Sequence, residues 1–329
     1  MEPLLDVQGL QVEFTTRAGV ARVLDDVSFS VGAGRILGIV GESGCGKSMT
    51  ALSILGLIPS PPGEVKSGRI MFQGRDLLSL SAEEMRELRG GDIAMILQEP
   101  MTSLNPVFTC VDQIAEAVRL HQPVSRAAAQ ARAVEMLRAV AIPEPEARAR
   151  AYPHELSGGM RQRVMIAMAL SCEPRLLIAD EPTTALDVTV QAQIFALLRD
   201  LRERTGTAII LITHDMGAVA EMADKVAVMY AGRVVERGPA DEVLDNPGHP
   251  YTRGLLASIP RIDTDPDEDL PEIPGIVPAL TDLGRGCAFA PRCPLAVDAC
   301  LAAQPGHVAM SPTHSAACIR LRETIEALA

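Results

Sequence analysis

The sequence predicts an α/β layered domain with a mainly parallel sheet. From Leu176 onward, short apolar runs that predict strands alternate with longer helical patterns, as is typical of a parallel sheet covered by helices. The composition agrees, because 47% of the 329 residues are hydrophobic, only 3% are aromatic and tryptophan is absent, so the core must be mainly aliphatic. Near the N-terminus, residues 36–57 add a strand–loop–helix unit around a glycine-rich turn.

Composition and charge restrict the class of protein. The formal net charge is −12, which argues against non-specific nucleic-acid binding as the main role. The N-terminal stretch MEPLLDVQGL lacks the basic and apolar regions of a signal peptide, and no apolar run is long enough to span a bilayer. We therefore expect a cytosolic chain, in which structural disulfides among the seven cysteines are not expected.

The N-terminal elements follow in order along the chain. Residues 4–14 and 23–31 are rich in β-formers and predict strands, and residues 45–57 predict a helix. Between residues 101 and 155 the sequence changes character. Here the Ala- and Arg-rich segment 125–140 has helical periodicity, and its charges predict a solvated face.

The C-terminal part has a different composition from the rest. Predicted strands continue as far as the apolar run 226–230, which places the end of the main domain, residues 1–256, shortly after it. Residues 257–283 are acidic and proline-rich, and they predict a semi-rigid linker. Residues 284–329 then form a small cysteine-bearing extension, and no internal repeat is visible.

A phosphate-binding loop is predicted between the strand at 36–40 and the helix that follows it. Residues 41–48, GESGCGKS, match G-x-x-x-x-G-K-[ST] in full and in the expected context. Backbone N–H groups and the helix N-terminus would surround phosphate oxygens, Lys47 would reach the β- and γ-phosphates, and Ser48 would ligate Mg²⁺. The predicted nucleotide-binding residues are Gly41, Glu42, Ser43, Gly44, Cys45, Gly46, Lys47, Ser48 and Met49.

An acidic pair follows the buried strand predicted at Leu176-Leu-Ile-Ala. Asp180 stands at the end of this strand, where its carboxylate can hold Mg²⁺ through the water shell. Glu181 can orient and deprotonate the attacking water. Alone, such a pair is more often a solvated loop, but together with the phosphate loop it predicts a site of ATP hydrolysis.

Residues 156–163, LSGGMRQR, resemble the signature sequence of ABC ATPases. The resemblance implies a P-loop ABC ATPase fold, with a RecA-like core, an antiparallel β subdomain and a helical subdomain at about 101–155. It implies that Ser157, Gly158 and Gly159 contact ATP bound to a partner subunit. It also implies roles for Gln98 on Mg²⁺ and the attacking water, Asp187 between protomers, His214 on the γ-phosphate and Phe14 on adenine, although Phe14 could equally be a core residue.

Three segments resemble the peptide/nickel subfamily of ABC importers: QEPMTSLNP at 98–106, NPGHPYTRGLL at 246–256, and the tail GCAFAPRCPLAVDAC at 286–300. The resemblance implies the ATP-binding subunit of an oligopeptide/dipeptide importer, peripheral at the cytoplasmic face of the inner membrane. Its partners would be a second ABC ATPase, two transmembrane permease subunits and, indirectly, a solute-binding protein. We favour a heterodimer of ATPases over a homodimer, and we expect no nucleic acid partner.

Three other functions remain open. The transported solute could be nickel or another small molecule, because importer ATPases do not touch the solute. A soluble ABC ATPase acting on ribosomes or DNA is a second alternative, but the chain has one P-loop and no heptad run. A nucleotide kinase is a third, but the LSGGM motif and the absence of a recognisable acceptor site argue against it.

The tail cysteines predict a metal centre. Cys287, Cys293, Cys300 and Cys318 are separated by five, six and seventeen residues, and structural zinc usually requires at least one C-x₂₋₄-C pair. We therefore favour a [4Fe–4S] cluster, which takes one thiolate per iron, over four buried thiols and over zinc. The resemblance implies such a cluster only in some relatives of the subfamily. A cluster would stabilise an extension too small to rely on its own core.

The other cysteines lie in the main domain. Cys45 stands in the phosphate loop, where serine is more usual, and a thiol at a helix N-terminus near Lys47 can have a lowered pKa and react with maleimides. The alternative is that Cys45 only fills space. Cys110 and Cys172 are predicted to be core residues.

Overall fold

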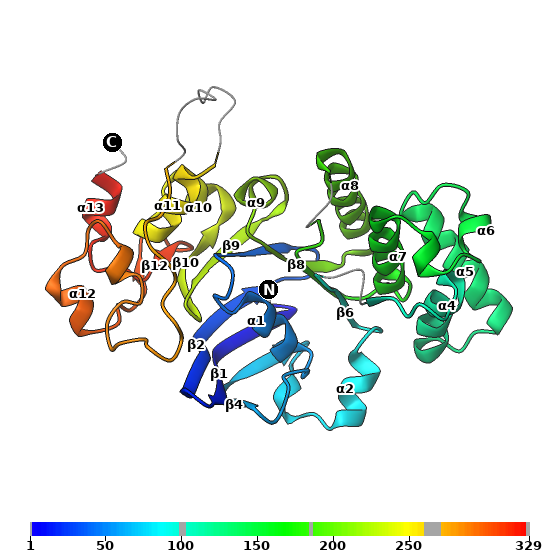
Figure 1. Ribbon diagram of the computed structural model, residues 1–329, viewed down its shortest axis with the longest axis horizontal. Helices are drawn as coiled ribbons and strands as arrows, with labels where there is room; N and C mark the ends of the chain where they lie inside the picture. The colour runs from blue at the N-terminus through cyan, green and yellow to red at the C-terminus, as the bar shows by residue number, and fades with distance from the viewer. Residues whose placement is uncertain (1, 99–102, 184–186, 260–270, 327–329) are drawn as a thin grey trace. The chain divides into compact units, whose positions relative to one another are not determined.

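The computed structural model describes residues 2–98, 103–183, 187–259 and 271–326, which form two compact units (Figure 1). The first, here called the helical unit, comprises Met1–Glu2, Val31–Arg35 and Ser79–Ile212. The second, here called the P-loop unit, comprises Pro3–Ser30, Ile36–Leu78 and Thr213–Ala329. The predicted phosphate loop and the cysteine-bearing extension therefore belong to the same unit.

An antiparallel sheet begins the P-loop unit. Its strands lie in the order β2–β1–β4–β5, with bounds Gly19–Val31, Leu5–Thr16, Gly63–Phe72 and Arg75–Asp76. Buried apolar residues such as Leu5 and Val7 alternate with more exposed ones along β1, as expected where one face covers the core. The strands predicted at 4–14 and 23–31 are confirmed. The second strand begins earlier than predicted because only a short turn separates it from β1.

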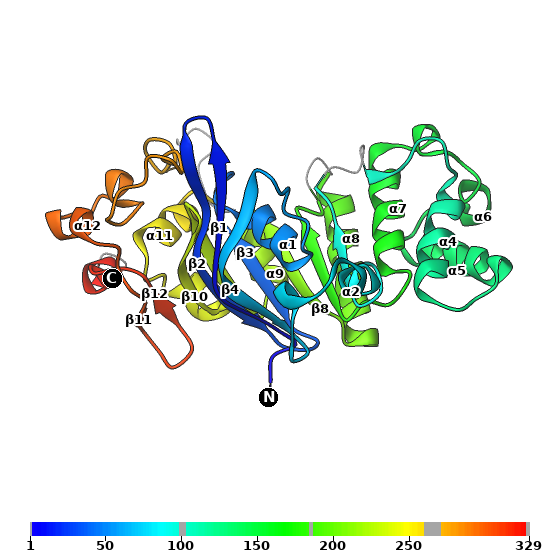
Figure 2. The ribbon, with the colours of Figure 1, turned by 90° about the horizontal axis from the view of Figure 1, so that it is seen from below.

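A second set of strands carries the phosphate loop. β3 (Ile36–Val40) lies parallel to β9 (Lys225–Tyr230), and β10 (Arg233–Pro239) pairs antiparallel with β9. Two short strands of the extension, β12 (Ser315–Ala316) and β11 (Val308–Ala309), add to β10 in turn (Figure 2). The extension thus continues the sheet, which the sequence patterns did not predict.

Helices and an aromatic cluster complete the P-loop unit. The helices are α1 (Lys47–Ile54), η1 (Leu77–Ser79), α9 (Met216–Met222), α10 (Ala240–Asp245), α11 (Pro250–Ala257), η3 (Ala290–Arg292), α12 (Asp298–Ala302) and α13 (Leu321–Glu326). Tyr230 of β9, Tyr251 of α11 and Phe289 of the extension pack together, with ring centroids 4.7 to 5.4 Å apart. This cluster joins the extension to the core of the unit.

The helical unit contains three parallel strands and most of the long helices. β6 (Ile93–Ile96), β7 (Leu176–Asp180) and β8 (Ala208–Thr213) pair in parallel, and β7 and β8 are buried throughout. This confirms the aliphatic parallel sheet that the sequence predicted. The helices are α2 (Ala82–Leu88), α4 (Cys110–His121), α5 (Arg126–Ala139), α6 (Pro145–Arg148), η2 (Pro153–Glu155), α7 (Gly158–Leu170) and α8 (Val188–Thr205).

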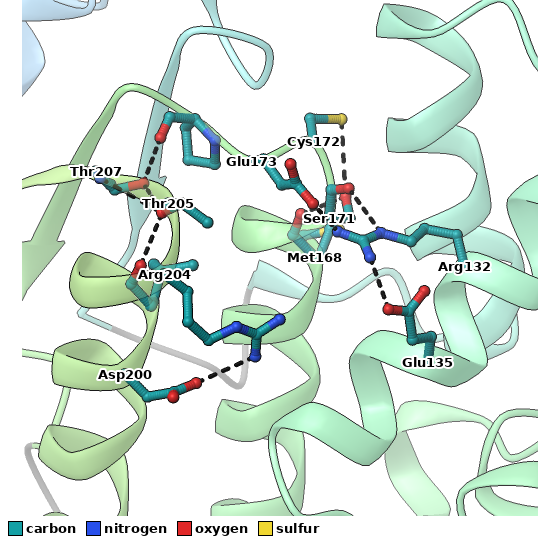
Figure 3. Close-up of polar contacts among 12 residues, drawn as sticks. Arg132, Glu135, Met168, Ser171, Cys172, Glu173, Asp200, Arg204, Thr205 and Thr207 are labelled. Carbon is teal, nitrogen blue, oxygen red and sulfur yellow. Dashed lines mark hydrogen bonds and ion pairs between the residues drawn. The ribbon is translucent and has the colours of Figure 1, made fainter.

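Three of these helices pack against one another. α4, α5 and α7 are mutual neighbours, and Figure 1 shows them grouped with α6. The predicted helix at 125–140 is confirmed as α5, which Ser125 caps by accepting a hydrogen bond from the Ala128 N–H. Arg132 of α5 donates to the Ser171 carbonyl oxygen and the Glu173 carboxylate at the C-terminal end of α7, as Figure 3 shows. This contact fixes α5 to the helix that begins with the signature sequence.

Candidate nucleotide-binding site

The phosphate loop has the strand–loop–helix geometry that the sequence predicted. β3 ends at Val40, and α1 begins at Lys47, with Gly46 as its N-cap. Gly41 and Gly46 have φ of 152° and 103°, which favour glycine. A Cβ atom would lie 2.2 Å from the Met229 carbonyl oxygen at Gly41 and 2.7 Å from Leu24 Cδ2 at Gly46. The motif glycines are therefore required by the close approach of neighbouring segments.

Lys47 is positioned by the loop itself. Its buried ammonium donates to the carbonyl oxygens of Gly41, at 2.7 Å, and Glu42, at 3.0 Å. Ser48, in the first turn of α1, is half-buried. The remaining backbone N–H groups at the start of α1 and the helix dipole favour an anion at this point. The arrangement can bind a phosphate chain.

Cys45 is a packing residue in this structure. Its side chain is fully buried, and the Sγ atom would lie 2.8 Å from a Cβ placed at Gly41. Burial raises the pKa of the Cys45 thiol, although the nearby Lys47 ammonium partly opposes this. The hypothesis of a lowered pKa is wrong, because desolvation of the thiolate outweighs the favourable charge and dipole. The alternative that Cys45 fills space fits its environment.

The predicted acidic pair lies in the helical unit. Asp180 is buried at the end of β7, and Glu181 follows it with a φ of 48°, in the left-handed region that non-glycine residues rarely adopt. The Glu181 N–H donates to the Ile212 carbonyl oxygen at 2.9 Å, which holds this conformation. The Gln98 Nε2 donates to Glu181 Oε2 at 3.0 Å. The structure thus brings together two predicted catalytic side chains that are 83 residues apart.

The signature residues form an exposed helix N-terminus. Ser157 caps α7 by accepting from the Met160 N–H at 3.4 Å, and the first turn has no acidic residue. A Cβ placed on the exposed Gly158 would meet no atom within 4 Å. Nothing in the part of the chain that the structure describes therefore requires glycine at position 158, so we expect any such requirement to come from a bound partner.

The remaining predicted site residues are placed as follows. Asp187 is exposed and caps α8, with its Oδ1 accepting from the Val190 N–H at 2.9 Å. Ala185 and Leu186 of the same motif lie outside the described residues. His214 is exposed in the P-loop unit, directly after β8. Phe14 is half-buried in β1 opposite Gly63, where a Cβ would lie 2.8 Å from the Phe14 ring. The ligand-binding roles of these residues remain predictions.

The four tail cysteines lie around one cavity. Cys287, Cys293, Cys300 and Cys318 line it together with His249 and Phe289. Burial raises the pKa of the Cys287 and Cys293 thiols and raises that of Cys318 to about 11. Over the part of the chain that the structure describes, no group of three or more His, Cys, Asp or Glu side chains is arranged to hold a metal ion. The predicted [4Fe–4S] cluster therefore has no preformed site in this structure, and it remains a prediction.

The two remaining cysteines, Cys110 and Cys172, lie in the helical unit. Cys110 is fully buried, which confirms the core prediction, and burial raises its pKa to about 11. Cys172 is only half-buried, and its Sγ donates to the Ala117 carbonyl oxygen at 3.6 Å. Neither thiol lines the tail cavity.

Two contacts to the phosphate loop were not predicted. Arg292 of η3 forms an ion pair with Glu42, the second residue of the loop, across 250 positions of sequence. The Tyr251 hydroxyl accepts from the Glu42 N–H at 2.8 Å. No local pattern could have revealed these partners, because each is brought to the loop only by the packing of α11 and the extension.

The chain is similar to two families along its length. Residues 24–184 match the ABC transporter family, and residues 235–300 match the oligopeptide/dipeptide transporter C-terminal region. Within the residues that the structure describes, no helix is both long and apolar enough to cross a membrane.

Individual proteins give the same result. The chain is 55% identical, over 98% of its length and 96% of the relative, to a probable peptide ABC transporter ATP-binding protein of Sinorhizobium fredii. It is 52% identical, over 94% of its length and 87% of the relative, to the oligopeptide transport ATP-binding protein of Bacillus subtilis. A solved dimeric ATP-binding cassette bound to ADP and phosphate is 25% identical and covers 72% of this chain and 98% of its own, with a TM-score of 0.66.

Proposed function

Because the chain belongs to the ABC transporter family of ATP-binding proteins, and within it to the group with the oligopeptide/dipeptide C-terminal region, we propose that it powers import of di- and oligopeptides. As a member of this family the chain is an ABC ATPase. The observation that carries the proposal is similarity to peptide-transport ATP-binding proteins over 98% of the chain, extension included. Peptides are preferred to nickel because the relatives named above are peptide transporters.

The P-loop unit binds the triphosphate of ATP in this proposal. Lys47 leaves the carbonyl oxygens of Gly41 and Glu42 to contact the β- and γ-phosphates, and the loop N–H groups surround the β-phosphate. Mg²⁺, when bound, neutralises charge on the phosphates. Ser48 and Gln98 are the proposed ligands of Mg²⁺, and Asp180 would hold the ion through its water shell. The half-buried Phe14 would stack on adenine.

Glu181 is the proposed general base. Its left-handed backbone and its hydrogen bond to Gln98 hold the carboxylate in one orientation. A carboxylate so placed accepts the proton of the attacking water as the water forms a bond to the γ-phosphorus and the bond to the ADP oxygen breaks. His214 would donate to the γ-phosphate oxygen that becomes more negative in the transition state.

Two ATPase subunits would act together. The exposed N-terminus of α7, with Ser157, Gly158 and Gly159, offers anion-binding groups at the protein surface. A partner's ATP would bind there, and Asp187 would contribute to the contact between subunits. The solved cassette with similar fold is a dimer. We propose a heterodimer with a related ATPase, with a homodimer as the alternative.

The helical unit is the proposed contact to the permease. Val107, Phe108 and Tyr152 expose apolar side chains, and a backbone bond from the Cys110 N–H to the Ala151 carbonyl oxygen brings their segments side by side. Exposed apolar residues grouped in this way are typical of interaction sites. A short amphipathic helix of a permease subunit fits this surface, and it would hold the chain at the cytoplasmic face of the membrane.

Peptide uptake tests the proposed function. A strain that lacks this chain should not accumulate a radiolabelled tripeptide, and the wild-type chain should restore uptake. A Lys47→Ala chain, expressed at the same level, should fail to restore it. Restoration of nickel uptake alone would contradict peptide transport, and co-purification with ribosomes in place of membranes would contradict transport altogether.

The tail cysteines are proposed to hold a [4Fe–4S] cluster. Support comes from the single cavity that Cys287, Cys293, Cys300 and Cys318 share. Their thiols would lose protons on binding, since thiolates are the ligands. After anaerobic purification, iron and sulfide analysis should find about four irons per chain, and Cys→Ser changes should remove them. One zinc per chain, or a metal-free protein, would contradict the cluster.

A further inference from the structure

The side chain of Arg292 joins the C-terminal extension to the phosphate loop. Arg292 Nη1 lies 2.6 Å from Glu42 Oε2, and Arg292 Nη2 lies 3.0 Å from Glu42 Oε1. Two parallel contacts of this kind form a fork, in which the planar guanidinium fits both carboxylate oxygens. Arg292 is therefore matched to Glu42 in geometry as well as in charge.

Groups outside the phosphate loop also hold the Arg292 guanidinium in place. Its Nε donates to the Pro274 carbonyl oxygen at 2.8 Å, its Nη2 to the Ile273 carbonyl oxygen at 3.2 Å and its Nη1 to the Tyr230 hydroxyl at 3.4 Å. It also lies over the Tyr230 ring, 5.9 Å from the centroid. The side chain is only 6% exposed. A buried cation held by so many acceptors cannot easily move away from Glu42.

The Glu42 backbone connects this ion pair to the phosphate-binding lysine. The Glu42 N–H donates to the Tyr251 hydroxyl, and the Glu42 carbonyl oxygen accepts from Lys47 Nζ at 3.0 Å. The carboxylate is thus turned towards the extension, while the carbonyl faces the lysine. A change in the position of Glu42 would move a group that contacts Lys47 directly.

A carboxylate within a phosphate-binding loop is an electrostatic problem. Triphosphate carries several negative charges, and an unpaired carboxylate in the loop that binds it would repel each of them and weaken binding. Arg292 supplies the compensating charge. Arg292 is buried, whereas the Glu42 carboxylate remains partly exposed to solvent and salt.

We propose that Arg292 is a positioning residue of the nucleotide site, which neutralises Glu42 and orients the phosphate loop, so that the extension sets the affinity for polyphosphates. The inference rests on the proposed function, because it requires that the loop bind MgATP. It adds to that function a role for the extension in nucleotide binding, separate from any group that the cysteines hold.

The test is a double-mutant cycle on the full-length chain, with Arg292→Gln, Glu42→Gln and the double variant. Dissociation constants for MgATP, MgADP and adenosine are measured by titration calorimetry. Arg292→Gln should weaken MgATP binding about tenfold, MgADP binding less, and adenosine binding not at all. Adding Glu42→Gln to this variant should restore MgATP affinity to within about threefold of wild type, because the unpaired charge is then gone.

Controls separate charge from loss of structure. Arg285→Gln removes an exposed arginine seven positions earlier in the same extension, and should bind MgATP as wild type does. Raising the salt concentration should reduce the defect of Arg292→Gln, since the added repulsion acts partly through solvent. If Arg292→Gln fails to fold, the neutral double variant still carries the test, because it buries no unpaired charge.

The possible results distinguish failure of the inference from failure of the proposed function. Wild-type affinity in Arg292→Gln would overturn the inference while leaving the proposed function intact. An equal loss of affinity for MgATP and adenosine, without rescue by Glu42→Gln, would mean that Arg292 only stabilises the fold. That result would also overturn the inference. A wild-type chain that does not bind MgATP would instead refute the proposed function.

Discussion

Glu181 combines an unfavourable backbone with a side-chain hydrogen bond to Gln98. A φ of 48° at a non-glycine residue costs roughly 1–3 kcal/mol, so it persists only where the surroundings hold it. Such strain is concentrated at functional sites. The sequence predicted Glu181 and Gln98 as catalytic residues from motif order, and their 3.0 Å contact is what the structure adds.

Glu181→Gln should separate binding of ATP from its hydrolysis. The amide keeps the shape and still meets Gln98, but it cannot accept a proton, so phosphate release should fall about 100-fold or more while MgATP binding persists. Phosphate release and calorimetric binding measure the two steps. Asp200→Asn, an exposed carboxylate on α8, is the control and should keep its rate. Undiminished turnover in Glu181→Gln would remove Glu181 from the role of base.

Gly158 offers the opposite case, a position that no neighbouring atom of the described residues constrains. Because a Cβ there has no neighbour within 4 Å, Gly158→Ala should leave the melting temperature unchanged. The added methyl would however meet a partner's nucleotide, so ATPase activity should fall at least about tenfold. Thermal unfolding and phosphate release measure the two effects together. A stable variant with full activity would argue against a role for the α7 N-terminus in a shared site.

Among the elements, α5 and α7 are connected by a half-buried arginine. Arg132 contacts Glu173 at 2.8 Å, Glu135 at 3.0 Å and the Ser171 carbonyl oxygen at 3.4 Å (Figure 3). These bonds are made at the C-terminal end of α7, and the signature residues lie at its N-terminal end. The contacts of Arg132 therefore fix the position of α5 relative to the C-terminal end of α7.

Arg132→Leu should destabilise the chain more than a matched change on the same helix. Arg132 is 24% exposed and satisfies a backbone carbonyl, so its loss should lower the free energy of unfolding by about 1 kcal/mol. Arg138, paired with Glu146, is 60% exposed, and Arg138→Leu should cost less than about 0.5 kcal/mol. Urea unfolding of both variants measures the difference. Equal costs would mean that Arg132 acts only as a surface charge.

Local sequence patterns predicted a helix or strand correctly where the residues of that element alone determine it. The strand–loop–helix at residues 36–57 and the helix α5 follow from periodicity and turn residues, and both are present. β11 and β12 could not be predicted, since two-residue strands have no periodicity and exist only because β10 offers an edge. The Arg292–Glu42 ion pair could not be predicted from the sequence for the same reason. Long-range packing brings these partners together, and the spacing of residues in the sequence does not indicate it.

In the molecule as a whole, the extension is part of the P-loop unit. Phe289 is 2% exposed and packs on Tyr230 and Tyr251, while the Ala317 N–H donates to the Val235 carbonyl oxygen at 2.7 Å. A short segment that could not bury a core of its own shares the core of the larger unit. The extension therefore contributes to stability whether or not its cysteines bind a cluster.

Phe289→Ala should test this contribution. Loss of a buried aromatic ring typically costs about 3–5 kcal/mol, so the midpoint of urea unfolding should shift strongly. Leu301→Ala, at an exposed apolar residue of α12 in the same extension, should shift it by less than about 0.5 kcal/mol. If the two variants unfold alike, the extension is an independent appendage.

The distance in sequence between the phosphate loop and its supports has a consequence for biosynthesis. Gly41 packs against the Met229 carbonyl oxygen, and Glu42 pairs with Arg292, 250 residues later. At a translation rate of about 5–20 residues per second, the ribosome would need roughly 10 to 50 s to make that interval. A nascent chain would expose an unsupported loop throughout this time. The loop would reach its full affinity for nucleotide only after Arg292 has been made and packed against Glu42.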